Sequence, residues 1–293
     1  MDYNSIGTPS ILTICVNYHN DEETASFVKE LLAQQGIFIQ RVIVVDNAES
    51  TGVNSPLRDL SHADERIWLR CPGKNMGYYG GAAWGLREFI KEFPLPDWII
   101  VCNTDMKFIN TDFMSNLCAF HSASHYAVIA PAIISDLSGR GQNPYMRTRP
   151  THFRMHFYKW VFRYYPISMI YQLFALAKNR IPFILKPVLV RLNANSDPKV
   201  LVPQQIYAPH GSFVAFSRKY FESGGTLEHG VFLFGEEIFV AETARHLGLT
   251  IVYDPRLQII HREHTTTSIF KSRKILGFVR EAAEYCADTF FTD

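Results

Sequence analysis

The sequence predicts an α/β fold, with a Rossmann-like, mostly parallel sheet flanked by helices. Short apolar runs rich in β-branched residues alternate with segments of helical spacing between residues 11 and 103. Several of these runs end in Asn or Asp, as in 11–17, 41–47 and 98–105. Of the 293 residues, 47% are hydrophobic, which is enough for a substantial core. Strands that alternate with helices are typical of a doubly wound parallel sheet.

The elements of the first half follow in a regular order. The apolar run 11–17 predicts a buried strand, and 21–35, with acids early and helical spacing afterward, predicts the helix that follows it. A glycine-rich helix is expected over 78–93. Further strands are expected at 41–47, 66–71, 98–103 and 127–134.

The alternation breaks near residue 139 and returns near residue 207. A strand-like run at 211–216 is followed by a helix at 235–247, a strand at 250–261 and an amphipathic helix at 271–290. We interpret 140–200 as a basic, aromatic helical insertion within one domain. The expected organisation is a domain over 9–265 with 9–136 as its first half, the insertion 140–200, and a terminal helix within 268–293 that covers the sheet or pairs with another subunit.

Charge is distributed unevenly along the chain. The net charge is +1, but residues 137–196 contain ten Lys or Arg and no Asp or Glu. The remaining 19 basic residues face 28 acidic ones, so the rest of the chain carries −9. The segment also contains many Phe, Tyr and Trp residues, a composition that suits a helix on an anionic membrane surface. The alternative is a basic helical subdomain whose aromatic residues form a core or a dimer contact. The acidic remainder argues against nucleic acid as a partner.

Cysteine usage and hydropathy predict a cytoplasmic protein, peripheral on the inner face of the plasma membrane if the insertion binds lipid. The five cysteines show no C-x-x-C spacing, which favours reduced thiols. The first ten residues lack a signal-peptide pattern. The longest uncharged part of the basic segment, 164–177, has 14 residues and contains a proline, so it is too short for a transmembrane helix.

Polar side chains follow several predicted strands. They are Asn17, Asp46 with Asn47, and Asn103-Thr104-Asp105, while Asn75 precedes the glycine-rich helix. Because ligands of open α/β sheets bind beyond the carboxyl ends of the strands, these groups would share one edge suited to a base, a ribose and a metal-bound diphosphate. The alternative for each residue taken alone is that it stabilises a turn or caps a helix.

Six stretches, in this order, resemble the family-2 inverting glycosyltransferases with the GT-A fold, particularly the rhamnosyl- and galactofuranosyltransferase-like members. The resemblance covers about residues 10–135 and 205–265. The stretches are Val-Val-Asp-Asn at 44–47, the glycine-rich 75–85, Asn-Thr-Asp at 103–105, Gly-Ser-Phe through Gly-Gly at 211–225, Phe-Leu-Phe-Gly-Glu-Glu at 232–237 and Ile-Ile-His at 259–261.

The resemblance implies a nucleotide-sugar donor, a UDP- or dTDP-sugar, and a divalent metal, Mg²⁺ or Mn²⁺. In the family, an acid at the last position of the strand-end triplet binds the metal, which carries over to Asp105. His261 resembles a histidine that reaches the metal or diphosphate, and its alternative is an ordinary edge histidine. Five positions match the donor-binding residues of the first half: Asn17, Asp46, Asn75, Gly77 and Asn103. Asn103 departs from the pattern, because other glycosyltransferases often have an acid there.

The resemblance also implies a catalytic base at the start of the helix near 235. An inverting transfer needs a group that takes the proton of the attacking acceptor hydroxyl. Glu237 stands at the family's position for this base, with Glu236 beside it, and which of the two acts stays open. Glu replaces the family's Asp at 237. The alternative is that both acids complement a helix N-terminus.

The expected function is inverting transfer of a sugar, of the hexosyltransferase type, to a glycan or lipid-linked glycan acceptor in bacterial surface polysaccharide synthesis. The alternative is a catalytically silent, membrane-peripheral protein that binds sugar nucleotides or serves as a scaffold, which the departures at 103 and 237 would suit. A sugar-1-phosphate nucleotidyltransferase would carry a glycine-rich, basic loop after the first strand. Residues 18–21, Tyr-His-Asn-Asp, are not such a loop.

Overall fold

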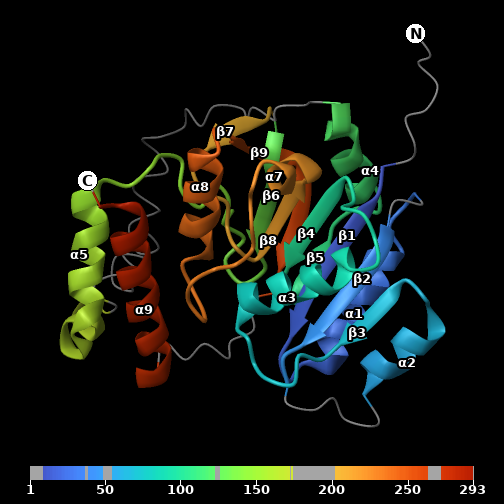
Figure 1. The fold of residues 1–293 in the computed structure, drawn as a ribbon, viewed down its shortest axis with the longest axis horizontal. Coiled ribbons are helices and arrows are strands. Elements are labelled where there is room, and N and C mark those ends of the chain that lie inside the picture. The colour runs from blue at the N-terminus through green and yellow to red at the C-terminus, as the bar shows by residue number, and fades with distance from the viewer. Residues whose placement is uncertain are drawn as a thin grey trace, which may run out of the picture. The chain divides into compact units, whose positions relative to one another are not determined.

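The computed structural model describes residues 9–36, 39–48, 55–122, 126–171, 173, 202–262 and 272–292 (Figure 1). The chain divides into two compact units, each considered by itself below. One comprises Met1–Arg149 with Pro203–His264, here called the sheet unit, and the other comprises Pro150–Val202 with Thr265–Asp293, here called the helical unit. The boundaries 9–265, 140–200 and 268–293 stay predictions.

The described residues of the sheet unit form a nine-stranded sheet. Its order is β3-β2-β1-β4-β8-β6-β9-β5, with β7 also paired to β9. The strands are β1 Ile11–Asn17, β2 Ile39–Asp46, β3 Ile67–Arg70, β4 Trp98–Cys102, β5 Met106–Phe108, β6 Tyr126–Ser135, β7 Gln204–Ile206, β8 Phe213–Ser217 and β9 Thr250–His261.

Six of these nine strands run in one direction. β3, β2, β1 and β4 are mutually parallel, and β6 is parallel to β9. β8 lies antiparallel between β4 and β6, so β6 regains the direction of β4. The mostly parallel sheet is therefore confirmed, and it gathers the carboxyl ends of β1, β2 and β4 at one edge.

Helices pack on both faces of the sheet. Phe27 and Leu31 of α1 belong to a buried cluster with alternate residues of the central strands, such as Cys15 and Val44. On the other face, α3 approaches so closely that a Cβ at Gly85 would lie 2.8 Å from Val45 Cγ2. The helices of this unit are α1 Asp21–Leu32, α2 Pro56–Ala63, α3 Tyr78–Ile90, α4 Phe113–Cys118, α7 Arg218–Glu222 and α8 Glu236–His246, and a 3₁₀ turn covers Ala119–Ser122.

The strands and long helices predicted from the sequence are confirmed to within a few residues, but the short elements were missed. The predicted helices 21–35 and 78–93 end earlier, at Leu32 and Ile90. The three-residue strands β5 and β7 are too short to show a period, and only their pairing with β9 defines them.

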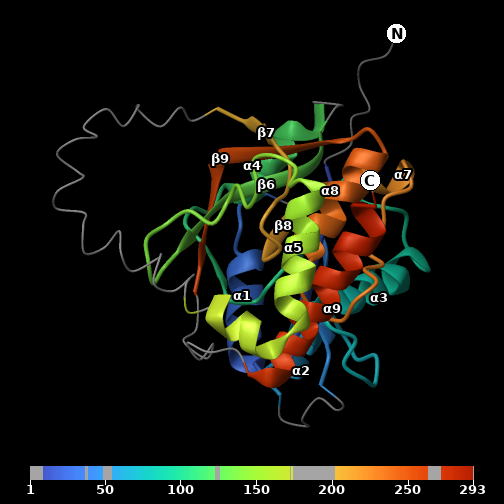
Figure 2. The same ribbon diagram turned by 90° about the vertical axis from the view of Figure 1, so that its left-hand side faces the viewer.

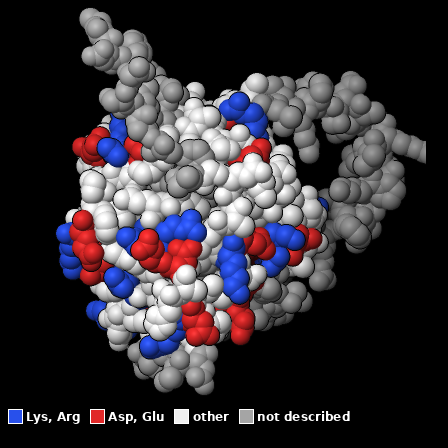
Figure 3. All heavy atoms as spheres, turned by 90° about the vertical axis from the view of Figure 1, so that its right-hand side faces the viewer, with Lys and Arg blue, Asp and Glu red and all other residues white. Residues whose placement is uncertain are grey.

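Figure 3 shows one face of the molecule, on which basic and acidic side chains are interspersed.

The helical unit contains an antiparallel pair of helices, α5 His152–Arg163 and α9 Arg273–Phe290. They lie side by side in Figures 1 and 2. Lys159 Nζ pairs with Asp288 Oδ1 at 2.5 Å, and the His156 ring hydrogen-bonds the Phe291 carbonyl at 2.9 Å. Residues 174–200 of the predicted insertion lie outside the described residues. In the part of the chain that is described, no helix is both long and apolar enough to cross a bilayer.

One face of α5 exposes an aromatic stripe. Its members recur at intervals of four and three residues, which places them on one side of the helix. Their exposed fractions are 78% for Phe153, 43% for Phe157 and 52% for Trp160. Tyr164, 48% exposed, directly follows the helix. Met155 and Val161 are buried. The stripe is therefore separate from the side of α5 that packs inside the unit.

Candidate active site

A buried network joins the ends of β1 and β2. Asn17 and Asp46 are register partners, and Asn17 Nδ2 donates to Asp46 Oδ1 at 3.0 Å and to Asp21 Oδ1 at 2.8 Å. The Thr24 hydroxyl donates to Asn17 Oδ1 at 2.8 Å. Asn17 is 0% and Asp46 1% exposed. The predicted juxtaposition of Asn17 and Asp46 is present, and its hydrogen bonds hold the start of α1 against the sheet edge. We call these four residues the strand-end network.

A second set of hydrogen bonds fixes the start of α3. Asn47 Nδ2 donates to the Gly77 carbonyl at 2.8 Å, and the Gly77 N–H donates to Asn75 Oδ1 at 2.9 Å. Gly77 has a φ of +74°, and a Cβ there would lie 1.9 Å from the Phe232 carbonyl oxygen. Only glycine fits this position, so Gly77 brings the start of α3 against the segment that precedes α8.

Asp105 and His261 meet at the end of β4. The pairing of Met106 with His261 aligns them, and Asp105 Oδ2 lies 3.1 Å from His261 Nε2. Gln142 Oε1 lies 2.8 Å from His261 Nδ1. When His261 Nδ1 donates to Gln142 Oε1, the Nε2 atom of a neutral ring is an acceptor, and it faces another acceptor, the Asp105 carboxylate oxygen. A proton or a cation shared by the two groups resolves that conflict.

The second oxygen of Asp105 adds a further indication of a cation. Asp105 Oδ1 is buried and has no hydrogen-bond partner among the described residues. An unsatisfied buried carboxylate oxygen is costly unless something else binds it. The described residues contain no cluster of three His, Cys, Asp or Glu side chains that would hold a metal alone. Mg²⁺ usually needs only one or two protein carboxylates, because substrate phosphates complete its shell, so Asp105 with His261 suits such an ion.

His210 is a residue of this region that the sequence did not reveal. Its ring centroid is 5.9 Å from that of His261, and its Nδ1 lies 2.8 Å from Ser212 Oγ. Burial lowers the pKa of His210 to about 4, and His261 contributes to the decrease although Asp105 opposes it. The ring is therefore neutral near pH 7. It directly precedes the 211–216 run, and no periodicity marks it.

The acidic pair opens α8, as predicted. Gly235, with a φ of +82°, precedes Glu236. Glu237 Oε1 accepts the Gly211 N–H at 3.4 Å, and a Cβ at Gly211 would lie 2.7 Å from Glu236 Cγ. Burial, followed by the charge of Glu237, raises the pKa of Glu236 to about 8. Glu236 is therefore largely protonated near pH 7.

Residues 210–212 connect these groups. His210 lies beside His261, Gly211 contacts the acidic pair, and the Ser212 carbonyl accepts the Asn103 N–H at 2.8 Å. The Tyr78 hydroxyl, from the first turn of α3, donates to the Gly211 carbonyl at 3.0 Å. Residues 210–212 thus link the metal-ligand candidates to the candidate bases. Asn103 joins this arrangement through its backbone N–H.

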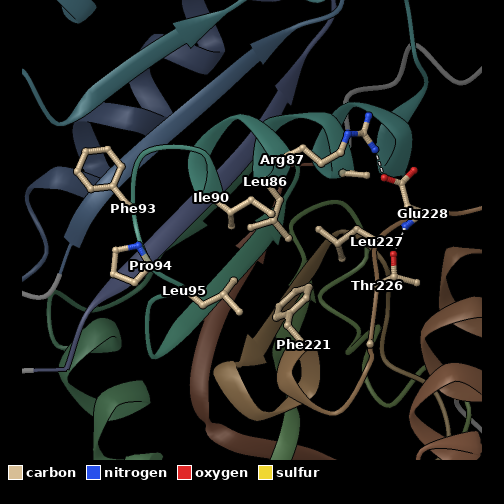
Figure 4. Close-up of a pocket in the computed structure, with 12 residues that line it drawn as sticks. Leu86, Arg87, Ile90, Phe93, Pro94, Leu95, Phe221, Thr226, Leu227 and Glu228 are labelled. Atoms are coloured by element: carbon tan, nitrogen blue, oxygen red, sulfur yellow. Dashed lines mark hydrogen bonds and ion pairs between the residues drawn. The ribbon is translucent and has the colours of Figure 1, made fainter.

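An apolar groove of about 470 Å³ lies elsewhere in the sheet unit (Figure 4). Leu86 and Ile90 of α3 line it together with Phe221 and Leu227, and an ion pair joins Arg87 to Glu228 at its rim. None of the predicted site residues lines this groove. The groove follows the second half of α3, from Ala83 to Ile90, whereas Gly77 precedes the first turn of that helix.

Comparisons with known proteins identify the fold. No family model matches the chain, and no curated protein matches it. Among solved structures, the mannosyltransferase PcManGT from Pyrobaculum calidifontis, in complex with GDP-Man and Mn²⁺, is similar with a TM-score of 0.50 and 12% identity over 95% of this chain and 70% of that one. GalNAc-T7 with UDP, GalNAc and Mn²⁺ is similar with a TM-score of 0.58 and 10% identity over 97% of this chain and 57% of that one. The mixed α/β sheet described above therefore has the architecture of GT-A glycosyltransferases.

Proposed function

We propose that the protein is a metal-dependent, inverting glycosyltransferase that uses a nucleotide-sugar donor. The observation that carries the proposal is the buried Asp105 Oδ1, which lacks a hydrogen-bond partner among the described residues and belongs to a carboxylate 3.1 Å from His261. It lies at the edge of a sheet whose structural neighbours contain Mn²⁺ with GDP-Man or with UDP and GalNAc. The donor class that follows is a nucleoside-diphosphate sugar, and UDP- or dTDP-sugars are our specific expectation.

Asp105 and His261 would hold the divalent metal, Mg²⁺ or Mn²⁺. When bound, such an ion supplies positive charge that stabilises a departing nucleoside diphosphate. Asn17, Asp46, Asn75, Gly77 and Asn103 are the proposed donor-binding positions. The Asn75 and Gly77 backbone at the start of α3 and the Asn103 backbone after β4 lie on elements that the hydrogen bonds described above fix in place. Because these backbone positions are already held in place, they can orient the donor without first becoming ordered themselves.

Glu237 is the proposed catalytic base, and Glu236 is its protonated neighbour. A base must be ionised before it takes the acceptor proton, and Glu236, whose pKa is raised to about 8, is largely protonated near pH 7, which favours Glu237 as the base. Gly211 has no side chain, so the acidic pair packs directly against residues 210–212. The proton of the acceptor hydroxyl would move to a Glu237 carboxylate oxygen as the hydroxyl oxygen attacks.

Measurement of donor-dependent nucleoside diphosphate release tests this proposal. A panel of UDP-, dTDP- and GDP-sugars with Mn²⁺ or Mg²⁺ should show metal-dependent release with at least one donor, and EDTA should abolish it. The anomeric configuration of the product, followed by NMR, should be inverted. Tight nucleotide binding without turnover for every donor and acceptor would instead favour the catalytically silent, sugar-nucleotide-binding alternative.

The proposed acceptor is a glycan or lipid-linked glycan of bacterial surface polysaccharide synthesis, used at the cytoplasmic face of the membrane. The aromatic stripe of α5 supports a membrane location, because aromatic rings with nearby Arg and Lys suit the interface of an anionic bilayer. The double variant Phe157→Ser/Trp160→Ser should therefore lose most co-sedimentation with vesicles that contain anionic lipid. Ile90→Ser, which changes an exposed apolar residue of the sheet unit, is the control. If the double variant and Ile90→Ser sediment with these vesicles to the same extent, the membrane proposal is contradicted.

A further inference from the structure

The sheet unit contains a second cavity, of about 490 Å³, that the proposed reaction does not use. Three arginines border it: Arg147, Arg149 and Arg245. The cavity lies between β7, the second half of α8 and the beginning of β9. Arg245 is eight residues beyond Glu237 on α8, which is about 12 Å along the helix axis. The cavity is therefore distinct from the candidate active site.

A buried glutamate fixes two of these arginines. Glu242, 2% exposed, accepts Arg149 Nε at 2.7 Å and Arg245 Nε at 2.8 Å. The Tyr207 hydroxyl donates to the same carboxylate at 2.5 Å. Burial opposes ionisation of Glu242, but the hydrogen bonds from Arg149, Tyr207 and Arg245 outweigh it and lower the pKa. The carboxylate thus stays charged and holds both guanidinium groups in a fixed orientation.

Positive charge at the cavity exceeds what Glu242 neutralises. Three guanidinium groups line the cavity and Glu242 carries one negative charge, while Arg147 hydrogen-bonds a neutral partner, Gln204 Oε1, at 3.0 Å. The Arg149 and Arg245 side chains are 36% and 55% exposed, so a ligand can reach them. The planar N–H fork of arginine matches the oxygens of a phosphate group.

The inner wall of the cavity is apolar. Ile206 and Ile251 are 5% and 3% exposed, and Leu249 lies beside them. The volume falls within the range of small-molecule sites and exceeds what an inorganic ion needs. We propose that this cavity binds an organic phosphate, with its phosphate on the three arginines and its apolar part against Ile206 and Leu249. The site goes beyond the proposed sugar transfer and does not depend on it.

Calorimetric titration of the full chain with phenyl phosphate tests the site. The wild-type protein should bind it saturably, and affinity should fall with added salt. Arg147→Gln and Arg245→Gln should each weaken binding by about 10-fold or more, since each removes charge-assisted hydrogen bonds. Arg147 is exposed, so its replacement leaves the buried Glu242 network intact. Arg66→Gln, which changes an exposed arginine paired with Asp64, is the matched control and should bind like wild type.

Vesicles distinguish the two sources of an organic phosphate. Phosphatidylcholine vesicles with and without phosphatidic acid are sedimented with wild type, Arg147→Gln and Arg66→Gln. If only Arg147→Gln loses binding to phosphatidic acid, the natural ligand is a lipid headgroup. If vesicle binding is unchanged while phenyl phosphate binding falls, the ligand is a soluble phosphate ester. No saturable binding of phenyl phosphate to wild type, or equal affinity in Arg147→Gln, would overturn the proposal.

Discussion

The strand-end network and the Asp105–His261 pair belong to one sheet and follow the same sequence pattern, but their side chains are satisfied to different degrees. In the strand-end network, the Asn17 amide uses both its nitrogen and its oxygen within the fold. Asp105 keeps a buried oxygen with no hydrogen-bond partner among the described residues. The comparison shows that Asn or Asp at a strand end can serve the fold or be left available for a ligand. Only the hydrogen-bond partners distinguish the two cases.

The largest effect is expected at Glu237, which we place with Asp105 among the residues that serve the reaction and not the fold. Glu237→Gln should lower turnover by about 10²–10⁴-fold, because it removes the base while keeping the shape of the side chain. Nucleoside diphosphate release measures turnover, and calorimetry should show unchanged donor binding. Loss of donor binding equal to the loss of turnover would remove Glu237 from the role of base.

The next largest effect is expected at the metal-ligand candidates. Asp105→Asn should weaken Mn²⁺-dependent donor binding by at least the roughly 10–100-fold that loss of a supporting residue costs at metal sites. Stability of the metal-free protein should change little, because Asp105 Oδ1 makes no hydrogen bond within the described structure and an Asn side chain keeps a polar atom facing His261 Nε2. Calorimetry with and without Mn²⁺, together with urea unfolding, measures both quantities. A destabilised variant with normal metal dependence would place Asp105 with the strand-end network.

The opposite result is expected for the strand-end network. Asp46→Ala should reduce the free energy of unfolding by about 1–3 kcal/mol, because it removes one of the two acceptors of the buried Asn17 amide and the acceptor of the Ala48 N–H. Urea unfolding of the ligand-free protein measures the loss. An unchanged unfolding curve combined with weaker donor binding would show that Asp46 serves only the nucleotide. Asp46 would then not differ from Asp105 in the way that we describe.

The last prediction concerns the pH dependence of stability. The pKa of Glu236 is raised from its ordinary value of 4.5 to about 8, so the folded protein keeps a proton that the unfolded chain releases. This contribution to stability is complete below pH 4.5, declines as pH rises towards 8, and is absent above it. The decline should approach at most about 1.4 kcal/mol per pH unit. Glu236→Gln should flatten it in metal-free urea titrations. A slope that persists in this variant would assign the proton to another group.

The parallel half of the sheet was predictable because its signals are local. The runs that form β1, β2 and β4 are mostly apolar and buried, and each is long enough to show its character. β5, β7 and the neighbourhood of His210 could not be predicted, because pairing with distant residues defines them. The juxtaposition of Asp105 and His261, 156 residues apart, was expected only from a resemblance. The partner-free oxygen of Asp105 has no sequence signal.

The place of β8 in the sheet has a consequence for how the protein is made. β8 fills the gap between β4 and β6, yet it follows β6 in the chain by 77 residues. A ribosome therefore releases β4 and β6 with open hydrogen-bonding edges well before residues 213–217 emerge. Such edges favour pairing with other nascent chains. A chain that stops before β8 should accumulate as insoluble material, and the sheet should close only after the second half has been synthesised.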